Sequence, residues 1–480
     1  MTIRFSHVVL ISTILLGGLI YVLHLRGFVT PANEVYARFC AIGIFSAGFL
    51  LLALQKARPH HVSWADFYKN DTLIIVSLTL LLASSFVLRD IAEYLVAHVG
   101  VAALSHFCYT RKFYPPIKLF YFVFLYALLM FFGTIGTQKG FHFPERTLTF
   151  YVLPLSLCFF RLSKETLLKI GEVFFKMAII FTVVCILYWW YNFLYLDTIF
   201  SDWVLKKTAF CAVIDEENIL CQSSYFWVNK WSGYYHPSFI SFVLFFGLII
   251  SFYLHSQKRI SKFELILSIA LCFSTVTLMQ SRIGIVGVLL IAVVSELYYL
   301  LKNGKRLAAL AFSVCVLIVG VGLHGQREKI DFEFTEDKIR ETYNQIAVSY
   351  IKDNFWWGSG FRDQREAMQQ QAEMMKDELP PFVYPHTEFP IYYVHNQFYG
   401  DMVQFGIWGL IALLLMLGAI AFYAIKNRCY LLQMTLFATF LLMVIEEPFY
   451  IAHSFVRFAL FLVFFVAIIE SEKQKTLNNT

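Results

Sequence analysis

Charged side chains are scarce in this sequence of 480 residues, at 15% of the total, whereas hydrophobic residues make up 59%. A soluble globular domain is about 25% charged and about 45–50% apolar. Phenylalanine alone contributes 51 residues, and the mean hydropathy is +0.63. A soluble fold has too little interior for so many apolar side chains, so a soluble enzyme, a DNA-binding protein and a disordered chain are excluded. The composition predicts an all-α polytopic membrane protein.

The sequence also lacks the short motifs that identify common soluble enzymes. It has no P-loop, no nucleotide-binding glycine fingerprint and no paired-cysteine zinc spacing. Acidic residues cluster between Asp331 and Asp337, but no histidine or further carboxylate is spaced to complete a metal shell. A solvated face explains these acids better than a metal site. We therefore expect neither a metal nor a cofactor.

Cysteine occurs mostly in apolar runs, where it behaves as a small hydrophobic residue. Cys211 and Cys221 differ, because both lie in one polar segment between apolar stretches. In an oxidising compartment this pair is able to form a disulfide, and the sequence leaves that question open.

Apolar runs recur at the length that a bilayer requires, about 17–25 residues. The candidate spans are 8–25, 38–55, 72–88, 92–109, 117–135, 147–161, 174–196, 236–255, 263–280, 283–301, 307–323, 403–424, 430–446 and 453–470. The weakest runs, 92–109 and 147–161, are short or interrupted by histidine or proline. Run 8–25 has no convincing cleavage site, so we expect a retained span rather than a signal peptide. The sequence thus predicts about 12–14 transmembrane helices.

Basic residues support this count because they fall on alternate connections. The clusters are Lys56, Arg58 and Lys69; Arg111 and Lys112; Arg161, Lys164 and Lys169; Lys258, Arg259 and Lys262; Lys302, Lys305 and Arg306; Lys426 and Arg428; and, in the tail, Lys473 and Lys475. Lysine and arginine are retained on the cytoplasmic side of a membrane protein. An even number of spans puts all these clusters and both termini in the cytoplasm.

This topology divides the chain into four parts. They are 1–323, with transmembrane helices 1–11 and a smaller periplasmic loop near 197–235; 324–402, a large periplasmic loop; 403–470, the C-terminal transmembrane helices; and 471–480, a cytoplasmic tail. The large loop carries an excess of acidic residues, whereas the rest of the chain is basic. Within the loop, Thr335 is placed to cap an amphipathic helix that stops before Trp356, and a polar helix is expected over 362–378.

Three polar residues at predicted membrane boundaries are candidates for chemistry. Arg282 lies at the external end of two apolar spans, where it either lines a cavity and meets an anion or snorkels to the interface. Arg340 lies beside the apolar edge of the loop helix, where a surface salt bridge with Glu336 or Asp337 would also explain it. His395 precedes a span, and its imidazole suits either a proton acceptor near pH 7 or a hydrogen-bonded interface residue.

Short motifs in the C-terminal half follow one another in a defined order. They are 233–238 (GYYHPS), which contains His236; Ser281-Arg282; Arg340; 352–361 (KDNFWWGSGF), which contains Gly358 and Gly360; His395-Asn396; and 406–410 (GIWGL). Their order and spacing over about 230–470 resemble the bacterial O-antigen ligase and O-antigen polymerase superfamily. Two positions depart from the family pattern. Phe355 replaces a usual proline, and Tyr343 stands in for a tryptophan, or that residue is absent.

The resemblance implies a metal-independent, inverting glycosyltransferase with a GT-C-type membrane fold. Its donor would be a glycan linked to undecaprenyl diphosphate, used at the periplasmic face of the bacterial inner membrane among membrane lipids. The acceptor would be a sugar hydroxyl on lipid A core for a ligase, or on a second lipid-linked glycan for a polymerase. No nucleic acid is expected as a partner.

The resemblance also implies roles for individual residues. His395 would be the catalytic base, because attack on the anomeric carbon requires an acceptor for the hydroxyl proton. Arg282 and Arg340 would bind the substrate diphosphate and stabilise the leaving group. The supporting residues are Asn396, Gly358, Gly360 and His236.

Three activities remain open. O-antigen ligation to lipid A core, in lipopolysaccharide biosynthesis, is favoured because the arginine, helix, GxG and His-Asn arrangement resembles ligases best. A polysaccharide polymerase acting on lipid-linked repeat units would use the same residues. A transporter of lipid-linked glycans would be expected to show inverted repeats and broken mid-span helices, and neither is apparent in the sequence.

Overall fold

A computed structural model describes most of the chain after residue 71. The described residues are 72–87, 92–135, 142–195, 211–215, 218–221, 237–278, 281–308, 310, 335–360, 364–379, 394–450 and 452–478. The candidate spans 8–25 and 38–55, most of 307–323, and His236 lie outside them.

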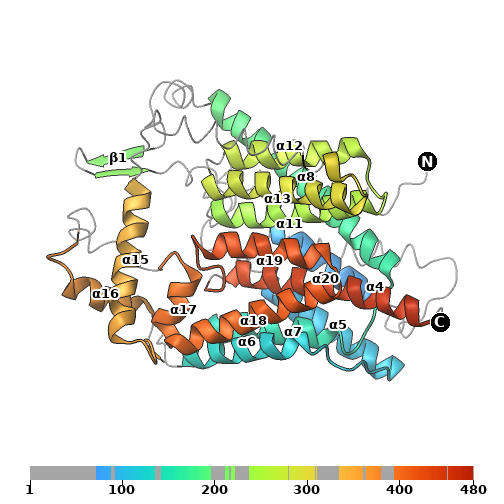
Figure 1. Ribbon diagram of the computed structural model, residues 1–480, viewed down its shortest axis with the longest axis horizontal. Helices are drawn as coiled ribbons and strands as arrows, with labels where there is room; N and C mark the ends of the chain where they lie inside the picture. The colour runs from blue at the N-terminus through green and yellow to red at the C-terminus, as the bar shows by residue number, and fades with distance from the viewer. Residues whose placement is uncertain are drawn as a thin grey trace, which may run out of the picture.

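The described chain is built almost wholly of α-helices (Figure 1). The larger group of helices comprises α4 (Thr72–Val87), α5 (Ala92–Thr110), α6 (Leu119–Ile135), α7 (His142–Ser156), α8 (Lys164–Tyr195), α11 (Pro237–Ser256), α12 (Lys262–Leu278), α13 (Arg282–Lys302), α18 (Ile407–Lys426), α19 (Tyr430–Met443) and α20 (Ala452–Asn478). A smaller group, here called the helical cap, comprises α15 (Thr335–Asp353), α16 (Gln364–Met374) and α17 (Gln397–Phe405). The helical cap lies at the left-hand end of Figure 1.

Two short strands form the one described sheet. Strand β1 (Cys211–Asp215) pairs with β2 (Asn218–Cys221) in an antiparallel hairpin. The register sets Cys211 opposite Cys221, the two cysteines for which the sequence leaves a disulfide open.

Four described helices contain segments long and apolar enough to cross a bilayer. The segments are Lys164–Leu187, Ile283–Lys302, Ile407–Lys426 and Ser454–Lys473. Shorter apolar segments are Thr72–Ser84, Leu95–Thr110, Leu119–Phe131, Ile240–Ser256 and Tyr430–Met443. Each corresponds to a candidate span from the sequence. The chain is therefore an all-α polytopic membrane protein, as predicted, and the total of about 12–14 spans stays a prediction.

Two predicted helix boundaries differ from the structure. The run 403–424 is divided, because Gly406 adopts a φ of 63° between the end of α17 and the start of α18. The polar helix expected over 362–378 is shorter, since α16 ends at Met374 and is followed by turns. At Gly406 the local backbone conformation, rather than hydropathy, sets the boundary.

Phenylalanine rings fill the interior around α20. The membrane-crossing segment of this helix is 89% buried. Phe461 stacks on Phe246 of α11 with centroids 3.9 Å apart, and Phe455 contacts Phe150 of α7 at 4.0 Å. Because lipid tails are as apolar as these side chains, close ring packing rather than exclusion of water stabilises such contacts.

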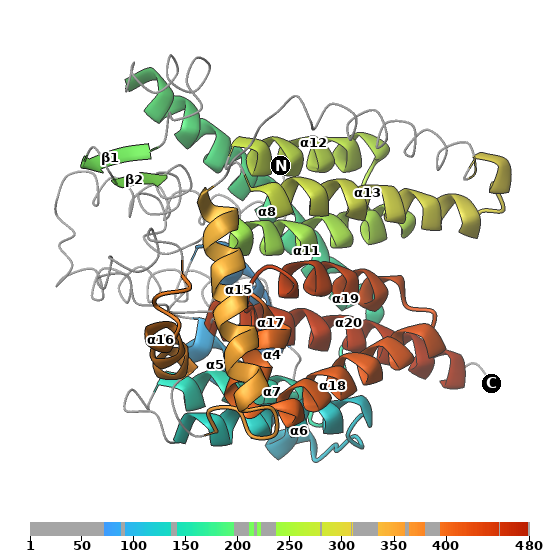
Figure 2. The ribbon, with the colours of Figure 1, turned by 60° about the vertical axis from the view of Figure 1, so that its left-hand side comes forward.

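The helical cap has a hydrophobic core of its own. Figure 2 shows α15 lying across α17, with α16 beside it. The buried residues of this second core are Ile346, Ala347, Ile351, Ala367, Met368, Ala372, Leu379, Val394 and Val403. The amphipathic helix predicted from Thr335 is therefore confirmed, and its apolar face packs against the other helices of the helical cap.

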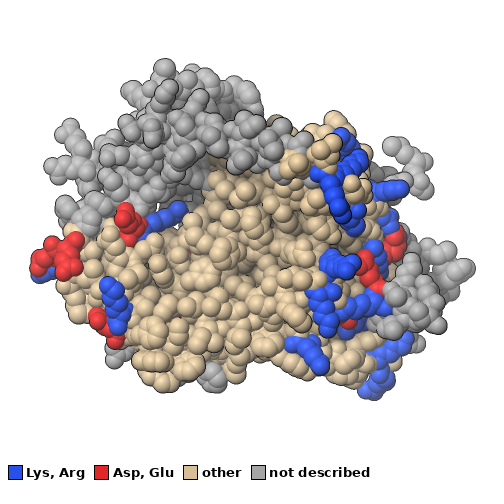
Figure 3. All heavy atoms as spheres, in the orientation of Figure 1, with Lys and Arg blue, Asp and Glu red and all other residues tan. Residues whose placement is uncertain are grey.

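Basic residues gather at the opposite end of the molecule, where the C-terminus lies (Figure 3). Ion pairs join separate connections there. Lys164 at the start of α8 binds Glu472 of α20 at 2.7 Å, and Arg259 in the α11–α12 connection binds Glu172 at 3.6 Å. The predicted basic clusters that these residues represent thus share one end, as their alternation along the chain requires.

Candidate functional site

The segment that follows α15 is held against the start of α18 by main-chain hydrogen bonds. Ser359 N donates to Val403 O at 2.7 Å, and Ile407 N donates to Phe355 O at 2.8 Å. The loop and the α17–α18 junction therefore form one rigid corner of the helical cap.

Two glycines cross at this corner. Gly358 has φ 59°, and a Cβ there would lie 2.6 Å from both Gly406 N and Val403 O. Gly406 has φ 63°, and its Cβ would lie 2.4 Å from the carbonyl oxygen of Trp356. Gly360 has φ 64° but open space around its Cβ position. Both the positive φ at position 358 and the lack of space for a Cβ thus require glycine there. The missing side chain lets the loop after α15 approach the backbone at the α17–α18 junction.

His395 is held in the left-handed region, with φ 57°, immediately before α17. On its N-terminal side, buried Val394 donates its main-chain N–H to Glu447 Oε2 at 3.1 Å. A residue other than glycine in this region costs about 1–3 kcal/mol and persists only where surrounding contacts impose it. Such strain is a feature of functional sites.

Asn396 holds the C-terminal side of His395. Its side-chain oxygen caps α17 by accepting from Phe398 N at 3.0 Å and Tyr399 N at 3.2 Å. Its Nδ2 donates to Val444 O at 3.1 Å. The Asn396 side chain thus caps α17 and ties it to the α19–α20 connection.

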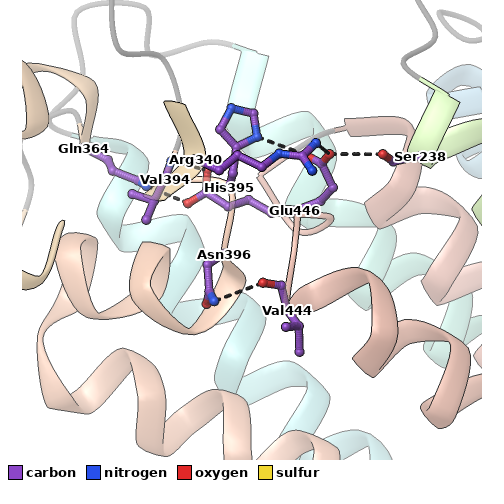
Figure 4. A network of polar contacts seen from close by, with 9 residues as sticks. Ser238, Arg340, Gln364, Val394, His395, Asn396, Val444 and Glu446 are labelled. Carbon is purple, nitrogen blue, oxygen red and sulfur yellow. Dashed lines mark hydrogen bonds and ion pairs between the residues drawn. The ribbon is translucent and has the colours of Figure 1, made fainter. Parts of the chain in front are cut away.

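Glu446 lies at the centre of the site, in the connection between α19 and α20 (Figure 4). Its Oε2 is 3.2 Å from His395 Nδ1. Its Oε1 accepts from Arg340 Nη2 at 3.1 Å and from Ser238 Oγ at 3.1 Å. The Glu446 side chain is 4% exposed, whereas those of His395 and Arg340 are each 29% exposed. A buried carboxylate thus ties together two partly accessible groups that are able to reach a substrate.

Tyr343 completes one side of this cluster. It lies one turn after Arg340 on α15, and its ring stacks on the imidazole of His395, with centroids 5.8 Å apart and planes 8° apart. Tyr343 is one of the two positions at which the motifs depart from the family pattern. An aromatic ring therefore lies against one face of His395.

Arg282 is the first residue of α13, and its side chain is outside the described part of the structure. The preceding Ser281 caps α13 by accepting from Gly284 N at 3.1 Å, and its hydroxyl is 3.0 Å from that of Ser241 on α11. Ser241 lies one turn after Ser238, which binds Glu446. The main chain at Arg282 is thus at the same end of α11 as the cluster.

Two further carboxyl groups are buried beside the cluster. Glu447 Oε1 accepts from Gln364 Nε2 of α16 at 2.7 Å, and burial raises the pKa of Glu447 to about 8. Asp401 accepts from Tyr126 OH at 2.9 Å, and burial raises the pKa of Asp401 to about 7. These contacts fasten α16 and α17 to the rest of the molecule.

The structure brings His395, Asn396 and Arg340 to the α19–α20 connection, where each of them bonds to that segment. Arg340 contacts Glu446, a residue that the sequence analysis missed because it ends a run interpreted only as a span. Adjacent acids at a predicted membrane boundary were the available signal, since ionisable groups there are costly. Among the described residues, no group of three or more His, Cys, Asp or Glu side chains is arranged to hold a metal ion.

The fold and the site define an integral membrane protein with an Arg–Glu–His cluster beneath a helical cap. Residues 267–414 match the family model described as O-antigen ligase. This match confirms the resemblance to the O-antigen ligase and polymerase superfamily seen in the motifs of this part of the chain. No curated protein matches the chain significantly. Glu446 lies outside the matched residues.

Proposed function

We propose that the protein is an O-antigen ligase that transfers a glycan from undecaprenyl diphosphate to a sugar hydroxyl of lipid A core. The Arg340–Glu446–His395 cluster carries this proposal. It sets a guanidinium, suited to a diphosphate, beside an imidazole, suited to a hydroxyl proton, and both are partly exposed.

The proposed reaction is a single in-line displacement at the anomeric carbon. The acceptor oxygen forms a bond to that carbon while the bond from the carbon to the diphosphate oxygen breaks. The hydroxyl proton passes to His395, and the electron pair leaves with undecaprenyl diphosphate. One displacement of this kind inverts the anomeric centre.

Arg340 and Arg282 are proposed to stabilise the diphosphate as it leaves. Nη2 of Arg340 donates to Glu446, and a guanidinium carries five N–H donors in a planar fork, so the group has further donors with which to address a phosphate. Two guanidinium groups supply the charge that a divalent cation supplies in many transferases. We therefore propose that transfer is metal-independent and that EDTA leaves the purified protein active. Loss of transfer in EDTA, restored by Mg²⁺ or Mn²⁺, would contradict this account.

The proposed location is the bacterial inner membrane, with the helical cap in the periplasm. The basic residues at the opposite end favour that orientation, because lysine and arginine are retained in the cytoplasm. The donor would then be engaged at the outer leaflet.

A gel of lipopolysaccharide from a deletion strain tests the activity. Loss of all capped core, with accumulation of lipid-linked polymer, is expected for a ligase. Core that bears a single repeat would instead identify a polymerase. Two results together would identify a transporter: lipid-linked glycan that fails to reach the periplasm in the deletion strain, and no glycan transfer by the purified protein. They would overturn both the ligase and the polymerase.

A further inference from the structure

Glu446 is the most buried member of the site and lies outside the residues that match the family. We propose that Glu446 is a positioning residue that orients His395 and fixes which ring nitrogen accepts the proton. This inference rests on the proposed function, in which His395 is the base.

The contact at Nδ1 is the first step of the argument. A carboxylate is only an acceptor, so at 3.2 Å from Nδ1 it requires that nitrogen to carry the proton. In the neutral ring, Nε2 then has the free lone pair. Figure 4 shows the other ring nitrogen pointing away from Glu446. Once Nε2 has taken the acceptor's proton, the carboxylate also stabilises the resulting imidazolium.

The other contacts of Glu446 explain why this carboxylate stays in place. Ser238 Oγ and Arg340 Nη2 both donate to Oε1, which leaves Oε2 directed at His395. The donors come from α11 and α15, so Glu446 fixes His395 relative to two other elements. Tyr343 stacks on the face of the imidazole and so restrains rotation of the His395 ring out of its plane.

Glu447 shows what a purely structural carboxyl looks like at the neighbouring position. It accepts from Gln364 Nε2 and from the main chain of Val394, and neither partner is able to act as a base. In Glu447→Gln the single amide oxygen keeps the contact with Val394 N, and the new NH₂ is able to donate to Gln364 once that side-chain amide turns to present its oxygen. Glu447→Gln is therefore the matched control for Glu446→Gln.

The first test compares these two variants in the full-length protein, in liposomes that contain lipid-linked donor and acceptor. In Glu446→Gln the amide oxygen still accepts from Arg340 and Ser238, so its NH₂ faces Nδ1 and drives the imidazole proton to Nε2. We expect kcat to fall about 10²–10⁴-fold, the usual contribution of general base catalysis, with the donor KM within about threefold. Glu447→Gln should stay within about threefold of the parent in both constants. A kcat for Glu446→Gln above half of the parent value overturns the proposal.

A double-mutant cycle separates positioning of His395 from support of Arg340. If Glu446 acts through His395, the His395→Ala/Glu446→Gln double variant should match His395→Ala alone within about threefold. The proposal is overturned if the losses in kcat from Glu446→Gln and His395→Ala are additive while those from Glu446→Gln and Arg340→Ala are not. That result would show that Glu446 supports Arg340 rather than His395.

Failure of this inference is distinguishable from failure of the proposed function. If His395→Ala is inactive and Glu446→Gln is active, only the positioning role is wrong. If His395→Ala keeps full turnover, the proposed base is wrong and the positioning role is wrong with it.

Discussion

His395 has an unusual backbone for its place in the chain. The other described non-glycine residues with positive φ are Arg111, Lys258 and Arg428, each just after a helix, where a left-handed residue is an ordinary way to end it. His395 instead precedes a helix, between two residues whose polar groups are bonded to the α19–α20 connection. The left-handed backbone of His395 therefore directs its imidazole toward Glu446, and the contact between the two side chains depends on that conformation.

Replacement of His395 by alanine should abolish most turnover without unfolding the protein. We expect kcat to fall about 10²–10⁴-fold, because the acceptor proton then has no positioned base. Expression and donor binding should change little, since the side chain is partly exposed. Transfer of labelled glycan by purified protein measures the loss.

His386→Ala is the control, because the family motif falls on His395 and not on His386, which lies outside the described residues. It should keep at least about half of the parent turnover. An essential His386 with a dispensable His395, in variants shown to be folded and inserted, would mean that the wrong base had been chosen.

Arg340 should tolerate lysine poorly. An ammonium is able to bind Glu446 but does not reproduce the planar fork that binds carboxylate and phosphate together. Arg340→Lys should therefore lose at least about tenfold in kcat/KM, and Arg340→Ala more. Recovery of full activity by lysine, measured with the same donor, would argue that only a point charge is needed.

At the scale of elements, the corner between the helical cap and α18 depends more on Gly358 than on Gly360. The Cβ of Gly358→Ala would lie 2.6 Å from backbone atoms of Gly406 and Val403. The Cβ of Gly360→Ala would enter open space, so its only cost is the left-handed backbone conformation. Gly360→Ala should cost about 1–2 kcal/mol of folding free energy. Gly358→Ala should cost more and should release the loop from α18. Thermal unfolding and limited proteolysis after α15 compare the two, and equal behaviour would contradict the crossing.

The connection between α19 and α20 should make stability depend on pH. Burial raises the pKa of Glu447 from 4.5 to about 8, so the folded protein keeps a proton that the unfolded chain has lost. The contribution of Glu447 to the free energy of unfolding is therefore complete below about pH 4.5 and is lost as pH rises through about 8. The melting temperature in detergent should decrease between about pH 5.5 and pH 8.5.

Glu447→Gln should flatten that decrease, because an amide does not titrate. Glu341→Gln, at an exposed position on α15, is the control and should leave the slope unchanged. An unaltered slope in Glu447→Gln would show that another group, such as Asp401 with its pKa raised to about 7, is responsible.

At the scale of the whole molecule, basic residues gather mainly at one end. Lysines placed far apart in the sequence share the end opposite the helical cap, where ion pairs link α8, the α11–α12 connection and α20. Since a bilayer separates the two ends of such a molecule, these lysines and the helical cap should be on different sides of the membrane.

Cysteine labelling in a variant without native cysteines tests this sidedness. Lys258, Lys305 and Lys426 are exposed at the basic end, and Gln370 is exposed on α16. A membrane-impermeant maleimide should label Gln370→Cys in whole cells and should label the other three only after permeabilisation. External labelling of Lys305→Cys would reverse the topology and with it the proposed periplasmic site.

Much of the architecture could be predicted because it depends on local patterns. Hydropathy located each described membrane helix, and the loop helix from Thr335 followed from its spacing of apolar residues. Boundaries failed at Gly406, because a left-handed break leaves no mark in hydropathy. The motifs located His395 and Arg340, since their order along the chain is itself the family's pattern.

The sequence alone determined the class of protein, the described spans and two members of the candidate site. Only the tertiary structure decided what joins them. Glu446 is 106 residues from Arg340 and 51 from His395, so no local spacing predicts that one buried carboxylate binds both. The physical reason is that periodicity fixes which face a helix buries, whereas the side chain that meets a given face depends on how α11, α15, α17 and the α19–α20 connection pack together.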